Sequence, residues 1–383
     1  MIGPILNFDS IGPREQSKLV GASFGPLSGY LAGKERGGRE VCALEDAWAE
    51  TFKVKHAIAC NSATSGLMAA AFAVGLKAGD EFVCPAMTMS ATCAAPMFTG
   101  ATPHFVDVED ETFGLICGPM PDTTKAIFST NLFGHPSPLG RNEWDKNCGV
   151  YLIEDNSQSP FAMAHDRYAG TMGHIGVFSL NVHKPIQCGE GGVIVTDDDD
   201  LAARMRAFIN HGEHVSDRIG LNLRMPEVCA AIAQVQLRRG EEIIQGRIDQ
   251  ATAILAAIGD IPGIRMPIVR KGCRHVYYTI PFLLSDEMRP GTANSDVNCM
   301  FPTARVRAAF CAALRAEGVP IIEGYVPPLY RMPAFERFAR PCPLAEDLHD
   351  RRLFYFENCA HDVTLAQTEQ IGAAFRKAAE MVL

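Results

Sequence analysis

The sequence predicts an α/β protein, and three observations support this fold class. Short apolar runs alternate with helical patterns through the first two-thirds of the chain. These runs are nearly continuous, which is typical of parallel strands that are buried on both faces. The chain has 383 residues, too many for one ordinary core and enough for a large and a smaller domain. We therefore expect a mostly parallel sheet sandwiched by helices.

Candidate strands and helices follow one another in the order that this fold needs. A strand at 56–60 precedes an Ala-rich helix at 65–76, and a strand at 81–84 precedes a helix at 90–98. The remaining expected strands lie at 103–108, 125–129, 150–154 and 193–196, and amphipathic helices lie at 199–210 and at 226–237, the latter continuing to 257.

A Gly/Pro-rich break at 259–263 marks the predicted domain boundary. We place a large domain at residues 1–258 and a small C-terminal α+β domain at residues 259–383. In the small domain we expect a strand at 276–284 and helices at 304–317 and 365–382. The polar stretch 287–302 is predicted to be an exposed loop.

Composition and charge narrow the choice of partners and compartment. The net charge of −9 and the pI of about 5.7 argue against a nucleic-acid or anionic-membrane partner. The N-terminus lacks the pattern of a signal peptide, and no apolar run is long enough to cross a bilayer. The 13 cysteines are scattered and indicate reduced, buried thiols. We expect a cytoplasmic protein without a metal site.

Three residue types at predicted strand ends point to one chemistry. Asp155 ends a predicted strand, where open α/β sheets bind ligands. Ser179 and Lys184 follow, and then a Gly-rich stretch at 189–192. Pyridoxal phosphate (PLP) needs an amine for its aldehyde, a carboxylate for its pyridine nitrogen and a hydroxyl for its phosphate. Each residue alone is more often a solvated charge, a cap or a turn, but their order favours a PLP site.

A fourth segment lies upstream, at residues 61–66, which we call the phosphate cup. It joins a predicted strand to the N-terminus of a helix. Backbone N–H groups and small hydroxyls at such a place form an anion site. A simple helix cap by Ser62 or Thr64 is the alternative, but the Lys184 segment favours phosphate. A Rossmann dehydrogenase is disfavoured, because no G-x-G-x-x-G motif follows the first strand.

These motifs resemble those of the DegT/DnrJ/StrS family of sugar aminotransferases, which are PLP enzymes of fold type I. The resemblance runs along most of the chain and is loose in the C-terminal domain. It implies a seven-stranded sheet in the large domain and an obligate homodimer with active sites at the subunit interface. The matching segments are 44–49, 61–67, 79–85, 100–108, 154–158, 178–192, 211–212, 221–225 and 230–237.

The resemblance also implies a role for each matching residue. Lys184 would be the Schiff-base lysine and the proton shuttle. Asp155 would pair with the pyridinium, and Gln158 would lie beside the cofactor, near its ring hydroxyl or its phosphate. The phosphate would be bound by residues of two subunits: Ala63, Thr64, Ser65 and Ser179 of one, and Asn222 and Arg224 of the other.

Two positions bear on the strength of cofactor binding and on the type of reaction. Met89 stands where the family usually has an aromatic residue that stacks on the cofactor. A thioether covers the ring with less area and rigidity, so we expect softer cofactor binding. Lys184 stands where related dehydratases have a histidine, and this favours a transaminase. His183, next to it, is a packing or substrate-contact residue.

The implied reaction is a ping-pong transfer of an amino group. An amino acid, L-glutamate by resemblance, would convert PLP to pyridoxamine phosphate (PMP), and the amine would then pass to a nucleotide-linked keto-deoxy sugar. Candidate substrate residues are His183, Tyr325, Tyr330 and Arg331, although the last three also fit a structural loop. The alternatives are a keto-cyclitol acceptor, a PMP-dependent sugar dehydratase and a non-catalytic regulatory relative. Lys184 argues against the dehydratase, and Lys184 with Asp155 against the non-catalytic relative.

Overall fold

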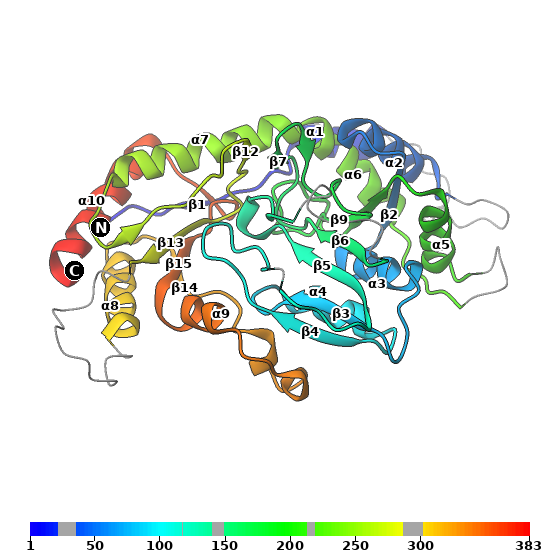
Figure 1. The fold of residues 1–383 in the computed structure, drawn as a ribbon. Helices are drawn as coiled ribbons and strands as arrows, with labels where there is room; N and C mark the ends of the chain where they lie inside the picture. Colours follow the sequence, from blue (N-terminus) through cyan, green and yellow to red (C-terminus); the bar gives the residue numbers. More distant parts are fainter. Residues whose placement is uncertain (22–35, 117, 140–148, 213–218, 286–301) are drawn as a thin grey trace.

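The computed structural model describes residues 1–21, 36–116, 118–139, 149–212, 219–285 and 302–383. A seven-stranded sheet forms its centre, in the order β2-β10-β9-β6-β5-β3-β4 (Figure 1). Strand β10 is antiparallel to both of its neighbours, and the other pairs are parallel. The predicted α/β fold with a mostly parallel sheet is confirmed. The strands are β2 (His56–Cys60), β3 (Glu81–Pro85), β4 (Thr102–Val106), β5 (Thr124–Thr130), β6 (Tyr151–Asp155), β9 (Ile175–Ser179) and β10 (Gly192–Thr196).

Helices cover both faces of this sheet, because successive strand residues point to opposite sides and most of them are apolar and buried. Ile194 of β10 packs in one core cluster with α3 (Ala63–Ala73), α4 (Ser90–Met97) and α5 (Asp199–Ile209). Its neighbour Val193 packs in the other cluster, with α2 (Arg39–Phe52) and α6 (Glu227–Arg238). There the Trp48 ring lies 5.1 Å from Phe52 and 5.3 Å from Phe178.

A second sheet, antiparallel and four-stranded, forms the core of the C-terminal part in the order β11-β13-β15-β14. Helix α7 (Gly240–Ile258) runs from the large sheet along this second core and packs on α10 (Figure 1). Gly259 follows α7 with a φ of +68°; the domain boundary that we place here stays a prediction. The other elements are β11 (Ile264–Arg265), β13 (Ile280–Leu284), α8 (Pro302–Ala316), β14 (Ile321–Glu323), α9 (Pro343–Asp347), β15 (Leu353–Phe356) and α10 (Leu365–Val382).

Three short pairings join segments that are far apart in the sequence. Strand β1 (Leu6–Asn7) pairs with β16 (His361–Asp362), so the N-terminal segment lies against the C-terminal part. Strand β12 (Cys273–Arg274) pairs with β7 (Met163–Ala164), which also pairs with β8 (Arg167–Tyr168). Both chain ends lie at the end of the molecule that the C-terminal part forms (Figure 1).

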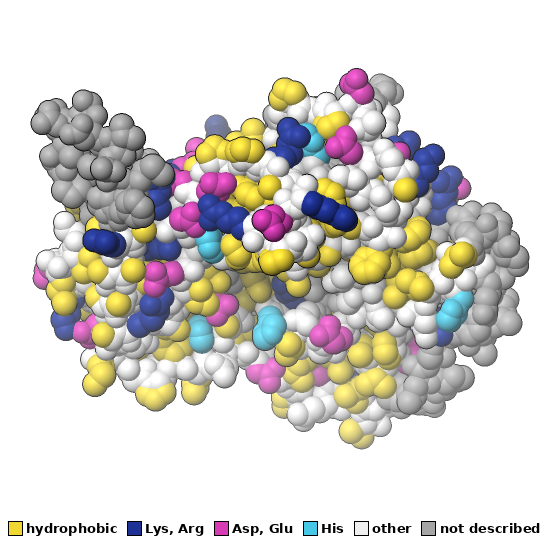
Figure 2. All heavy atoms as spheres, turned by 90° about the horizontal axis from the view of Figure 1, so that it is seen from below, with side chains coloured by type: hydrophobic (Ala, Val, Ile, Leu, Met, Phe, Trp, Pro, Cys, Tyr) yellow, Lys and Arg dark blue, Asp and Glu magenta, His cyan; other side chains and the backbone are white. Residues whose placement is uncertain are grey.

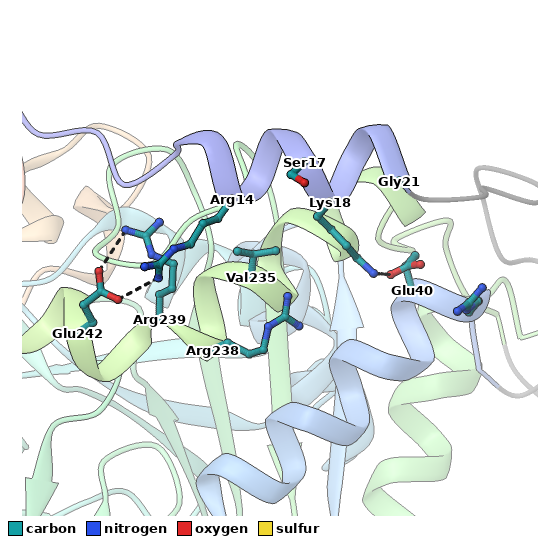
Figure 3. A pocket seen from close by; sticks show the side chains of 10 residues that line it. Arg14, Ser17, Lys18, Gly21, Glu40, Val235, Arg238, Arg239 and Glu242 are labelled. Carbon is teal, nitrogen blue, oxygen red and sulfur yellow. Dashed lines mark hydrogen bonds and ion pairs between the residues drawn. The ribbon is translucent and has the colours of Figure 1, made fainter.

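Helix α1 (Pro13–Gly21) lies over a polar groove that is formed with α2, α6 and the start of α7 (Figure 3). Lys18 of α1 pairs with Glu40 at 2.8 Å, and Arg14 pairs with Glu242 at 3.2 Å. These ion pairs attach α1 to α2 and to the start of α7.

The structure differs from the sequence-based expectation in a few elements. The helix expected over 226–257 is two helices, because the backbone breaks at Arg239 between α6 and α7. The strand expected at 276–284 begins only at Ile280, after Tyr277 with its φ of +50°. The predicted loop at 287–302 lies outside the described residues except for Pro302, which begins α8.

The surface carries charges of both signs. On the face shown in Figure 2, acidic and basic side chains are scattered between patches of hydrophobic ones. No helix in the described ranges combines the length and the apolar character needed to cross a membrane.

Candidate active site

The site is built at the carboxyl edge of the large sheet. Asp155 ends β6, and the register β6–β9 places it opposite Val177, two residues before Ser179 ends β9. Gly192, at the start of the reversed strand β10, pairs with Ser179 on one side and with Cys60, the last residue of β2, on the other. The reversal of β10 thus places the carboxyl ends of β2, β9 and β6 along one edge.

Lys184 lies in a tight loop after β9. Its N–H donates to the Asn181 carbonyl at 2.9 Å, and the Asn181 side chain donates to Glu190 at 2.8 Å. The Val182 N–H donates to the Gly189 carbonyl at 2.9 Å, which closes the loop. Burial lowers the pKa of the Lys184 amine, and the nearby Asp155 carboxylate acts in the opposite direction. A larger fraction of this amine is therefore neutral at neutral pH than for an exposed lysine.

The buried carboxylate of Asp155 is held by a chain of hydroxyl groups. Thr92 of α4 donates to Asp155 Oδ2 at 2.7 Å. Thr92 and Thr88 share a hydrogen bond of 2.9 Å, and Thr88 and Thr130 share one of 3.0 Å. Since each hydroxyl has one proton and that of Thr92 is used on the carboxylate, Thr88 donates to Thr92 and Thr130 donates to Thr88. Ser157 N–H also donates, to Oδ1 at 3.2 Å.

The phosphate cup lies at the N-terminus of α3. Ser62 is the N-cap and accepts the Ser65 N–H at 3.1 Å, while the Ser65 hydroxyl donates to Asn61 at 2.6 Å. Gly192 packs directly beneath: a Cβ there would lie 2.6 Å from the Ser62 carbonyl carbon. Thr64 is exposed, whereas Ser65 and Ser179 are buried. The helix N-terminus and these hydroxyls suit a phosphate dianion.

Gln158 links two segments that are far apart in the chain at this edge. Its carbonyl oxygen accepts the Phe133 N–H at 2.7 Å, and its amide donates to the Tyr325 hydroxyl at 3.0 Å. Burial raises the pKa of Tyr325, so its hydroxyl stays protonated. The structure thus brings two predicted site residues, Gln158 and Tyr325, into contact.

Other predicted site residues lie toward the outside. Met89 is 55% exposed at the start of α4, and Ala63 begins α3. Asn222 is exposed, and its backbone bridges to Asn210. Arg224 bridges to Cys60 through the backbone and donates a hydrogen bond of 2.9 Å to the Asn210 side chain of its own subunit.

The remaining predicted substrate residues differ in their surroundings. His183 is exposed beside Lys184. Tyr330 is buried and donates to Glu346, and its oxygen accepts the Cys342 N–H at 3.2 Å. Arg331 forms ion pairs with Glu346 and Asp350. Their contacts are those of a structural cluster, and their role at the acceptor stays a prediction.

Sequence reasoning missed four residues of the site. Thr88 and Thr92 hold Asp155, Tyr278 lies under the Lys184 amine, and Cys359 is near that amine. Thr88 and Thr92 stand in the segment around Met89, so their i, i+4 spacing at a helix start was a signal. Tyr278 and Cys359 come from the distant C-terminal part, and only the tertiary fold brings them to the site.

The donor set fits pyridoxal phosphate. Asp155 is a buried carboxylate suited to a pyridinium nitrogen, Lys184 supplies a desolvated amine for an aldehyde, and the N-terminus of α3 suits the phosphate. The fold and this site define a PLP-dependent enzyme of fold type I.

The chain belongs to the DegT/DnrJ/EryC1/StrS aminotransferase family, whose model matches residues 31–376. It is a transaminase, and its cofactor is pyridoxal phosphate. It is 30% identical over 322 residues to a protein of Escherichia coli O157:H7 named GDP-perosamine synthase, covering 81% of this chain and 83% of that protein.

Two further comparisons agree with this assignment. A protein of Acidithiobacillus ferrooxidans named UDP-N-acetyl-3-dehydro-alpha-D-glucosamine 3-aminotransferase is 30% identical over 326 residues, covering 82% of this chain and 83% of that protein. The structure of an aminotransferase from Psychrobacter cryohalolentis superposes with a TM-score of 0.85 at 24% identity, over 99% of this chain and all of the other. At that identity the likeness shows the fold.

We predict that Thr92→Val weakens PLP binding about tenfold or more. The substitution keeps the shape but removes a hydrogen bond to a charged carboxylate, worth about 1.5–3 kcal/mol. The dissociation constant of PLP, measured by spectroscopic titration, tests this. Thr92→Ser keeps the hydroxyl and is the matched control; equal affinity in the Val and Ser variants would contradict the role of the hydroxyl chain.

We also predict that Met89→Phe tightens PLP binding. An aromatic ring covers the cofactor with more area and fewer rotatable bonds than a thioether. We expect a gain of a fewfold in affinity, corresponding to about 0.5–1.5 kcal/mol for an aromatic pair. The same titration measures it, with Met89→Leu as the control for apolar area alone. A Phe variant that binds PLP no more tightly than the wild type would refute the softer-binding hypothesis.

Proposed function

We propose that this enzyme transfers an amino group from an amino acid to a nucleotide-linked keto-deoxy sugar. The observation that carries the proposal is the half-buried Lys184, whose amine has a pKa lowered by burial and lies near the buried Asp155 carboxylate at the sheet edge. The names of the two relatives above support the acceptor class, because both include a nucleotide-linked sugar. We propose L-glutamate as the donor, following the family resemblance.

The residues of this chain have separable tasks. PLP, when bound, supplies an electron sink that stabilises negative charge at the reacting carbon. Asp155 keeps the ring nitrogen protonated, and the hydroxyl chain from Thr130 fixes the direction of its carboxylate. Lys184 accepts and returns a proton beside the reacting carbon, for which a pKa lowered by burial is suited.

Substrate recognition is proposed for residues at the mouth of the site. Tyr325 presents a protonated hydroxyl that is held by Gln158, and His183 is exposed next to Lys184. Tyr330 and Arg331 would act on the acceptor only indirectly, through the cluster with Glu346.

We propose that the enzyme is a homodimer whose subunits complete each other's sites. Apolar side chains next to the site residues are exposed in one subunit: Met89 at 55%, Val182 at 53% and Leu221 at 43%. Such apolar exposure beside polar residues is typical of an interaction surface. A cytoplasmic location is also proposed, because the cysteines in the described ranges are free thiols.

The decisive experiment is the visible absorbance of the purified protein with PLP, before and after L-glutamate. We expect a band from Lys184-bound PLP that bleaches when glutamate is added. Lys184→Ala should lose this band, because no other amine replaces it at the cofactor aldehyde.

Two outcomes would contradict the proposal. Absence of the band in the wild type with added PLP would refute catalysis and favour a regulatory relative. A band that persists with every amino acid tested would refute the donor half-reaction. The acceptor class is then tested with GDP- and UDP-linked keto sugars against a keto-cyclitol, with product identified by mass spectrometry.

The shared site predicts complementation between two defective variants. Asn222→Asp places a negative charge beside the proposed phosphate of the partner, and Lys184→Ala removes the amine. After subunit mixing, a heterodimer has one site with both native residues, so about a quarter of wild-type activity should return if each variant alone is inactive. No recovery, despite heterodimers seen by native mass spectrometry, would place Asn222 in its own subunit's site.

A further inference from the structure

The Lys184 amine lies over the face of an aromatic ring. Its nitrogen is 4.7 Å from the centroid of Tyr278, within the range of about 6 Å for a cation–π interaction. The negative face of the ring attracts an ammonium group more than a neutral amine. Tyr278 comes from the C-terminal part of the chain, whereas Lys184 follows β9 of the large sheet.

The Tyr278 backbone is fixed from two sides. Its carbonyl accepts the Cys359 N–H at 3.1 Å. Its N–H side packs against Gly134 so closely that a Cβ at Gly134 would lie 2.7 Å from the Tyr278 nitrogen. Gly134 has a φ of +108°, so other residues are disfavoured there for a second reason. The main chain that carries the ring therefore has little freedom.

Three titratable groups face the amine. Asp155 comes from β6, Cys359 follows β15, and Tyr278 precedes β13. Burial raises the pKa of Cys359 to about 12 and also raises that of Tyr278, so both groups are neutral at neutral pH. Asp155 is then the carboxylate that faces the amine, and the Tyr278 ring acts on the amine through its quadrupole.

We propose that the Tyr278 ring is a positioning residue that holds the free, protonated Lys184 amine between proton transfers. The inference rests on the proposed function, which requires the amine to leave the cofactor and return. A ring face attracts the ammonium without removing its proton. Unlike a carboxylate, it does not form an ion pair that would hold the amine away from the cofactor. Asp155 remains free for the cofactor nitrogen.

The test measures the amine itself, in the protein without PLP. The rate of acetylation of Lys184 by acetic anhydride is followed against pH by peptide mass spectrometry, for the wild type, Tyr278→Phe and Tyr278→Leu. The ring favours the ammonium form, so its loss lowers the pKa of Lys184. We expect the midpoint of the curve of acetylation rate against pH to fall by about half to one pH unit in the Leu variant. In the Phe variant this midpoint should stay unchanged.

A second substitution keeps the test valid if the Leu variant does not fold. Tyr278→pentafluorophenylalanine keeps a flat six-membered ring but withdraws electron density from its face, and it should lower the midpoint as Leu does. A wild-type midpoint in both the Leu and the pentafluorophenylalanine variants would overturn the proposal, as would an equal fall in the Phe variant.

The same experiment separates this inference from the proposed function. If PLP gives no band but the midpoint falls as expected, the ring holds the amine and the proposed function fails. If PLP binds and bleaches normally while the midpoint does not move, the function stands and the role of Tyr278 is refuted.

Discussion

The active site depends on the close packing of Gly192 against the peptide that joins Ser62 to Ala63. A single Cβ at Gly192 would lie within 2.6 to 2.8 Å of three backbone atoms of the phosphate cup. This contact exists because β10 runs against its neighbours and begins where β2 and β9 end. The helix N-terminus that follows β2 is thereby packed against Gly192, the pairing partner of Ser179, and this is the end of the site that suits an anion.

The other end of the site is a buried negative charge, which has to be stabilised. Two acidic residues, Glu154 and Asp155, end β6 and point to opposite sides of the sheet. Glu154 accepts hydrogen bonds from the backbone N–H groups of Gly170, Met172 and Gly173, all within 2.8 Å. Its carboxylate therefore has a structural role. Asp155 accepts fewer of these hydrogen bonds, one from Thr92 and one from the Ser157 N–H, so its carboxylate can accept a further hydrogen bond.

Much of this could be predicted from sequence because the signals are local. Nearly continuous apolar strands such as β2 and β10 indicate burial on both faces, and the Asp155 and Lys184 segments carry residue types that only a few chemistries need. What could not be predicted depends on contacts between distant segments. This class includes Tyr278, Cys359 and the Gln158–Tyr325 hydrogen bond. The spacing of residues in the sequence does not predict which loop of the C-terminal part reaches the sheet edge.

The turn at Leu132–Gly134 explains how the C-terminal part is held at that edge. Phe133 has a φ of +58°, a conformation that costs about 1–3 kcal/mol for a residue with a side chain and persists only when its surroundings enforce it. The enforcing contact is Gln158, which accepts the Phe133 N–H and donates to Tyr325, while the Phe133 ring lies 5.1 Å from that tyrosine.

The next residue, Gly134, accepts the Val276 N–H at 2.9 Å and packs against the backbone of Tyr278. One strained turn therefore sets the positions of both Tyr325 and Tyr278. A change in this turn would therefore disturb the contacts of both Tyr325 and Tyr278, the first proposed to meet the acceptor and the second to hold the Lys184 amine.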